Sequence, residues 1–159
     1  HENVITAKAI AFKEAMQPEF KEYAKQIKAN AKVLEVELGS RGFKLMFGGT
    51  DNHLLLIDVT PKDVTGHEAE TALDKAGITV NKNMIPDDPR KPLDPSGIRL
   101  GTPALTTRGM KEDEMRKVAD WIDRAISARN DDDELSKIKA EVEEMTKNFP
   151  LYEKLSYTE

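Results

Sequence analysis

The sequence of 159 residues contains no cysteine. Disulfide bonds, thiolate metal sites and a cysteine nucleophile are therefore excluded. Histidine is also scarce, and His1, His53 and His67 have no spacing typical of a metal site. No apolar run approaches the ~20 residues of a membrane-spanning helix, and no charged start followed by an apolar stretch indicates a secretory signal. We expect no metal site, no membrane association and a cytoplasmic location.

Basic residues are fewer than acidic ones, 24 against 29, and the net charge is −5. No long basic stripe interrupts this balance, which disfavours nucleic-acid binding. Hydrophobic residues make up 38% of the chain and charged residues 33%, as in a globular chain with a modest core. The first residue is His1 rather than methionine, so we expect the chain to begin inside a longer one.

Four segments carry apolar residues at intervals of three and four, the spacing that lines one face of a helix. They cover about residues 3–16, 18–38, 115–126 and 135–145. A shorter helix is predicted between Thr65 and Gly77.

The remaining apolar runs indicate strands. Residues 43–47 and 53–59 flank a run of turn residues and predict a β-hairpin, and residues 78–80 and 98–100 predict two further short strands. Residues 81–97 contain four prolines and predict a long irregular loop, which is typical of a functional or disordered segment. Together the elements predict an α+β domain, in which long helices pack on a small, mostly antiparallel sheet.

Three segments are similar, residue by residue, to the serine (glycine) hydroxymethyltransferase family. They are residues 48–54 (GGTDNHL), 77–83 (GITVNKN) and 96–109 (SGIRLGTPALTTRG). Their order and spacing fit the family, and residues 7–20 resemble the helix that leads from its large cofactor domain into its C-terminal domain.

The resemblance implies a fold-type-I enzyme that uses pyridoxal 5'-phosphate and interconverts serine and tetrahydrofolate with glycine and 5,10-methylenetetrahydrofolate. Residues 1–16 would be the helix linking to an absent N-terminal cofactor domain, and residues 17–159 the small C-terminal domain. The complete protein would be a homodimer or tetramer. The family's cofactor lysine lies in a Thr-His-Lys motif that this sequence lacks. We therefore expect no catalytic residue here, no confident cofactor-binding residue, and no activity from the chain alone.

Arg99 is the strongest candidate for a substrate-binding residue. Its position in the Ser-Gly-Ile-Arg motif implies that it binds the carboxylate of the amino-acid substrate. A guanidinium suits this task because its planar fork donates two parallel hydrogen bonds to a carboxylate, which lysine cannot reproduce. The residue alone would favour a structural ion pair at a strand edge.

Asn83 is the second candidate, because its place in the resembling segment implies a contact with folate. An amide both donates and accepts, which suits the mixed edge of a pterin ring. A turn-forming asparagine before a proline-rich loop is an equally weighted interpretation, and Asn81 is interpreted as structural. Residues 90–95 (RKPLDP) depart from the family pattern, so folate contacts are not carried over to that loop.

Other residues receive structural interpretations. We expect His53 to be packed, Gly48, Gly49 and Gly101 to meet backbone needs, and residues 131–134 to start a helix rather than bind a cation. For Arg108, a contact with polar cofactor or backbone groups and a salt bridge at a helix start remain open.

Two functions compete with that of a part-enzyme. The chain could be a binding or assembly module that seeks a partner through a former interface. It could also be a small folate- or amino-acid-binding protein using Arg99 and Asn83 alone. The latter is disfavoured because half of the site's walls would be missing, and affinity requires enclosure.

Overall fold

The computed structural model describes residues 1–151 and has the α+β architecture that the sequence predicts. Its helices and strands follow each other in the order α1 Glu2–Ala15, α2 Pro18–Ser40, β1 Lys44–Leu45, β2 Leu54–Asp58, α3 Gly66–Lys75, β3 Asn81–Asn83, β4 Gly97–Gly101, α4 Pro103–Thr107, α5 Glu112–Ser127 and α6 Asp132–Thr146. Short 3₁₀ turns at Met46–Gly48 and Thr60–Lys62 flank β2. No described helix is long and apolar enough to cross a membrane.

The strands form one antiparallel sheet in the order β1-β2-β4-β3. The predicted hairpin is present, because β1 pairs with β2. Strand β4 lies between β2 and β3, with Arg99 opposite Leu56 on one side and opposite Asn81 on the other. Residues 97–99 are thus paired on both sides, and β3, like β1, is an edge strand.

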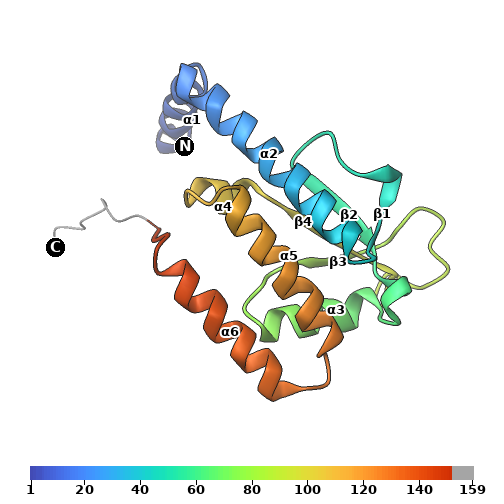
Figure 1. The fold of residues 1–159 in the computed structure, drawn as a ribbon. Coiled ribbons are helices and arrows are strands. Elements are labelled where there is room, and N and C mark those ends of the chain that lie inside the picture. Colours follow the sequence, from blue (N-terminus) through green and yellow to red (C-terminus); the bar gives the residue numbers. More distant parts are fainter. Residues whose placement is uncertain (152–159) are drawn as a thin grey trace.

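The helices cover one face of this sheet (Figure 1). Alternate strand residues such as Leu55, Ile57 and Ile98 point into the core, where they meet Leu34 of α2 and Leu73 of α3. Helix α5 contributes the widest apolar face, with six buried residues. Since all long helices lie on the same side, the opposite face of the sheet is left open within the described part of the chain.

The N-terminal arm does not join this core. Helix α1 has no buried residue, and Phe12 and Met16 are 68% and 82% exposed. Only the second half of α2 packs on the sheet, because its buried residues begin at Asn30. In Figure 1 the arm extends beyond the body of the domain. It therefore presents an apolar stripe that nothing in the described chain covers.

Two strands lie at positions that differ from those predicted from the sequence. The strand expected at 43–47 is only Lys44–Leu45, because the chain turns at Phe47, whose φ of 58° is left-handed. The strand expected at 78–80 lies at Asn81–Asn83, and the irregular loop is shortened to residues 84–96. The predicted positions of the four long helices are confirmed to within a few residues.

Candidate functional site

The open face of the sheet gathers the polar residues that the sequence singled out. Because side chains alternate along a strand, Arg99 lies on the face opposite to Ile98. Antiparallel pairing places Asn81 beside it on the same face, and Asn83 beside Gly97. Strand β2 adds Leu56 on the other side of Arg99. The face thus carries the Arg99 guanidinium, two amides and an apolar border, and at its β1 edge Lys44 pairs with Asp58.

Arg99 is exposed and makes no hydrogen bond or ion pair with any residue of the described range 1–151. The other six arginines all donate to a carboxylate or a carbonyl oxygen. The structural ion pair that the residue alone would favour is therefore absent among the described residues. None of the hollows described below is lined by Arg99.

Asn83 and Asn81 differ in what their amides do. Asn83 is half-buried, and its Nδ2 donates to the carbonyl oxygen of Met84 at 2.6 Å. Asn81 is exposed and has no side-chain hydrogen bond within residues 1–151. The strand that carries both is fixed by Lys82, whose Nζ lies 2.5 Å from Oε2 of Glu70 on α3. The Lys82 hydrogen bonds lower the pKa of the Glu70 carboxyl.

The loop between β3 and β4 (residues 84–96) is closed at its base by Asp88. The carboxylate accepts hydrogen bonds from the backbone N–H groups of Ile85, Arg90 and Ser96, and from Oγ of Ser96 at 2.6 Å. Burial alone would raise the pKa of Asp88, but these donors outweigh it and lower the pKa to about 2. The clamp holds both ends of the loop and thereby the spacing of β3 and β4.

Residues 90–95, where the sequence departs from the pattern of the resembling family, are held together by contacts within the loop. The Arg90 guanidinium donates to the carboxylate and carbonyl oxygen of Asp94. Leu93 at the tip is 85% exposed. Among the described residues, Arg90 and Asp94 form an ion pair with each other and with no residue outside the loop.

A polar hollow of about 440 Å³ borders the same face of the sheet beside β2. Residues 48–52 form its rim, and Leu54 and Leu56 form its floor. Glu35 of α2 holds the rim in place, because its Oε2 accepts from the Thr50 N–H at 2.8 Å. Leu56 lines this hollow and is also the partner of Arg99 across the sheet. Residues 48–54, the first family-like segment, therefore lie near Arg99.

Several structural interpretations can be compared with the fold. Asp131 caps α6 by accepting from the Glu134 N–H, as expected. Arg108 binds backbone groups, donating to the carbonyl oxygens of Thr146 and Phe149 at the end of α6. The expectation for His53 was wrong, because this residue is exposed at the entry to β2.

One functional-looking residue escaped the sequence reasoning. Asn30 is fully buried in α2, where its Nδ2 donates to Oγ1 of Thr106 at 2.9 Å and to the carbonyl oxygen of Met110 at 3.0 Å. Its signal was available, since Asn30 interrupts the apolar stripe between Ile27 and Leu34. Its role is to join α2 to α4.

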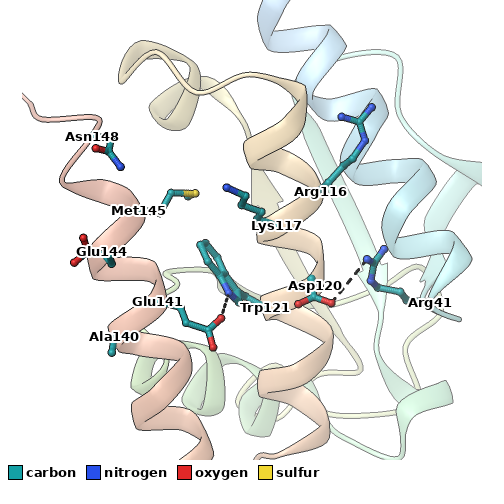
Figure 2. Close-up of a pocket in the computed structure, with 10 residues that line it drawn as sticks. All are labelled: Arg41, Arg116, Lys117, Asp120, Trp121, Ala140, Glu141, Glu144, Met145 and Asn148. Atoms are coloured by element: carbon teal, nitrogen blue, oxygen red, sulfur yellow. Dashed lines mark hydrogen bonds and ion pairs between the residues drawn. The ribbon is translucent and has the colours of Figure 1, made fainter.

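Another hollow, about 860 Å³, is a shallow groove between α5 and α6 (Figure 2). It belongs to the helical layer, whereas Arg99 lies on the opposite face of the sheet. Among its charged lining residues, Arg41 lies 4.0 Å from Asp120, and Glu141 binds the Arg124 guanidinium at 2.7 Å. We interpret the groove as the seam between two helices.

The described residues offer no cluster of three metal-ligating side chains. They also offer no lysine suited to hold pyridoxal phosphate on the open face. Lys44 there lies 3.0 Å from Asp58, and Lys82 is bound to Glu70. The described residues of the sheet do not fit this cofactor.

The fold and this face define a small α+β domain that exposes one unpaired guanidinium between two strands. A sequence model of the family described as serine hydroxymethyltransferase matches residues 1–122. The chain belongs to this family.

Curated relatives agree with the match. Serine hydroxymethyltransferases from Acidobacterium capsulatum, Myxococcus xanthus and Koribacter versatilis are 57%, 58% and 55% identical over 150 residues. These alignments cover 94% of the chain but only 35–36% of each relative. The chain thus spans about a third of the length of the relatives it matches.

Proposed function

We propose that the chain is the C-terminal small domain of a serine hydroxymethyltransferase, with residues 1–16 leading to a cofactor domain. The complete protein would interconvert serine and tetrahydrofolate with glycine and 5,10-methylenetetrahydrofolate. The observation that carries the proposal is the guanidinium of Arg99 on the open sheet face, which has no partner among residues 1–151. An exposed arginine with no partner in this range suits a ligand that arrives from outside it.

In this proposal Arg99 binds the carboxylate of serine or glycine. Two parallel N–H···O bonds from a planar fork fix the direction of the bound amino acid as well as its position. Pairing of β4 on both edges, with Leu56 and with Asn81, supports the backbone from which this side chain projects. A rigid strand holds a binding group more accurately than a loop does.

Asn83 remains the proposed folate contact. Its amide oxygen has no donor among residues 1–151, although its Nδ2 is engaged by Met84. That oxygen could accept from a ring N–H of the pterin. The Asp88 clamp fixes the end of the strand that carries it.

Pyridoxal 5'-phosphate would supply the electron sink for the bond that breaks. It would be held by the rest of the protein, because the described residues do not fit it. The parts assigned here to the chain are to bind and orient the amino acid and to close one side of the site. Homodimer or tetramer formation and a cytoplasmic location also remain predictions.

The test is Arg99→Lys in the complete protein with its cofactor bound. We expect the KM for serine to rise and kcat to fall, with kcat/KM reduced about 100-fold or more, since the bidentate geometry is lost. Arg129→Lys is the matched control, because Arg129 contacts only the carbonyl oxygen of Asp63 on another surface. Kinetics of Arg99→Lys equal to those of the control would remove Arg99 from the site.

A second candidate, an assembly module, is favoured by the uncovered apolar stripe of α1. Its exposed members are Ile5, Phe12 and, just after the helix, Met16. A stripe of this kind is typical of an interface. This function predicts a concentration-dependent oligomer of the isolated chain on size-exclusion chromatography, and Phe12→Glu should shift it toward monomer. A monomer at every concentration would exclude the candidate.

A further inference from the structure

We propose that Asn81 is a second carboxylate-binding residue, acting beside Arg99. The inference rests on the proposed function and adds to it a residue that the sequence reasoning treated as structural. It would give the site two different donors, one cationic and one neutral, on adjacent strands.

The register of the sheet carries the argument. Asn81 and Arg99 are directly opposite each other in the β3–β4 pair. Residues in such a pair have Cβ atoms about 4.5–5.5 Å apart and side chains on the same face. Both residues are exposed, and neither makes a side-chain hydrogen bond within the described range 1–151. Two unsatisfied polar groups therefore stand side by side at the open face.

Asn83 does not share this position. Its partner across the sheet is Gly97, which has no side chain, and its Nδ2 is engaged by the carbonyl oxygen of Met84. The neighbour of Arg99 on the other side is Leu56, which is apolar. Asn81 is thus the polar side chain that lies beside the guanidinium among the described residues.

The chemistry of a carboxylate fits this pair. A carboxylate has about four acceptor sites, and a guanidinium fork occupies two of them. The Nδ2 of Asn81 can donate to a third site, while its Oδ1 accepts one of the remaining guanidinium N–H groups. The amide would then both bind the ligand and keep the fork turned toward it.

Strand β3, which carries Asn81, is held in place by a contact with helix α3. Although β3 is an edge strand of three residues, Glu70 of α3 accepts hydrogen bonds from both N and Nζ of Lys82. A donor fixed before the ligand arrives loses less entropy on binding.

The experiment compares Asn81→Ala and Asn81→Asp in the complete protein with its cofactor bound. Glycine is the probe, and its Kd is measured by titration calorimetry alongside the KM and kcat for serine. We expect Asn81→Ala to weaken glycine binding about 10- to 100-fold, the usual effect of losing one hydrogen bond to a charged group. Asn81→Asp should weaken it further, because a second carboxylate repels the ligand and competes for the guanidinium.

The aspartate variant keeps the shape of the side chain but removes its N–H donor. A Kd for glycine in Asn81→Asp equal to that of the wild type, or an unchanged Kd in Asn81→Ala, would overturn the inference. Arg129→Lys is the control and should leave the Kd for glycine unchanged, because Arg129 donates to the carbonyl oxygen of Asp63 on another surface.

Two further variants complete the design. Asn81→Val suits a strand and lacks a donor, so it replaces Asn81→Ala if that protein does not fold, with the same expected loss. Arg99→Lys tests the proposed function separately. If Arg99→Lys weakens glycine binding and the Asn81 variants do not, this inference is rejected and the proposed function stands. If Arg99→Lys binds glycine as the wild type does, the proposed function is rejected.

Discussion

The indole Nε1 of Trp121 donates a hydrogen bond to Oε2 of Glu141 at 2.6 Å, and this bond crosses the seam between α5 and α6 (Figure 2). Trp121 is 6% exposed, whereas Glu141 lies at the surface and also binds the Arg124 guanidinium. The hydrogen bonds from Arg124 and Trp121 lower the pKa of the Glu141 carboxyl. One carboxylate thus ties two helices together.

Glu141→Ala should destabilise the fold by about 1–3 kcal/mol, because the buried indole N–H loses its acceptor. Trp121 is the only tryptophan of the chain, so its fluorescence reports both unfolding and local exposure. Denaturant titration followed by fluorescence measures the effect. Glu144→Ala is the control on the same helix, since Glu144 pairs only with exposed Lys147 and should cost less than about 0.5 kcal/mol. Equal losses in both variants would contradict the assigned role of Glu141.

Arg108 supports the second prediction, which concerns the end of α6. Its Nε donates to the carbonyl oxygen of Phe149 at 2.9 Å, and its Nη2 to that of Thr146 at 3.3 Å. Positive charge near a helix C-terminus is stabilising, and carbonyls there lack partners inside the helix. Arg108→Ala should therefore cost about 1–2 kcal/mol and speed hydrogen exchange in the last turn of α6. Unaltered exchange in that turn would show that Arg108 does not hold it.

Asp88 gives a prediction about pH. Its pKa of about 2 in the fold lies below the value of about 3.9 expected in an unfolded chain. The unfolded state therefore binds this proton first on acidification. The stabilisation is complete above about pH 4 and is lost as the pH falls toward 2. Amide resonances of Ile85, Arg90 and Ser96 in the folded protein, followed by NMR, should shift together on acidification, with a midpoint at about pH 2.

The matching substitution is Asp88→Asn, which turns an NH₂ group toward backbone donors and breaks part of the clamp. Faster hydrogen exchange at Ser96 and Ile85 is expected already at neutral pH. Asp87→Asn is the neighbouring control, because Asp87 is exposed with a φ of 53°, a conformation that asparagine tolerates. If the amides of Ser96 and Ile85 exchange at the wild-type rate in Asp88→Asn, the carboxylate of Asp88 does not hold the loop.

The helices were predictable because their burial pattern repeats along the chain, as the apolar residues of α5 show. The position of β3 was not. Val80 is apolar and 8% exposed, yet it packs outside a strand, while polar Asn81 and Lys82 pair with β4. Pairing there is fixed by Glu70, whose contact with Lys82 depends on the tertiary fold. Periodicity within a short segment contains no such information.

The site was predictable only through resemblance. Arg99 was identified by its motif, but its lack of an ion-pair partner depends on which carboxylates the fold brings near it. Asn81 was interpreted as structural, since the resemblance assigned a ligand contact only to Asn83. The register separates them, since it places Asn81 opposite Arg99 and Asn83 opposite a glycine.

Gly49 gives the last prediction. Its φ is 139°, and a Cβ built on it would lie 2.5 Å from the carboxyl carbon of Glu35. That carboxylate also accepts from the Thr50 N–H, and it binds Lys32 at 2.8 Å. Gly49→Ala therefore combines backbone strain with displacement of the group that holds the rim of the hollow. We expect a loss of about 2–4 kcal/mol in the free energy of unfolding, measured by denaturant titration.

Gly48→Ala separates the two causes. Gly48 also has a positive φ, 76°, but no atom lies within 4 Å of its virtual Cβ. The cost there should be confined to the backbone, about 1–2 kcal/mol. A further variant, Glu35→Ala combined with Gly49→Ala, should lose less than the sum of the single changes, because the collision is already removed. Strict additivity of the two substitutions would show that Glu35 does not make Gly49 necessary.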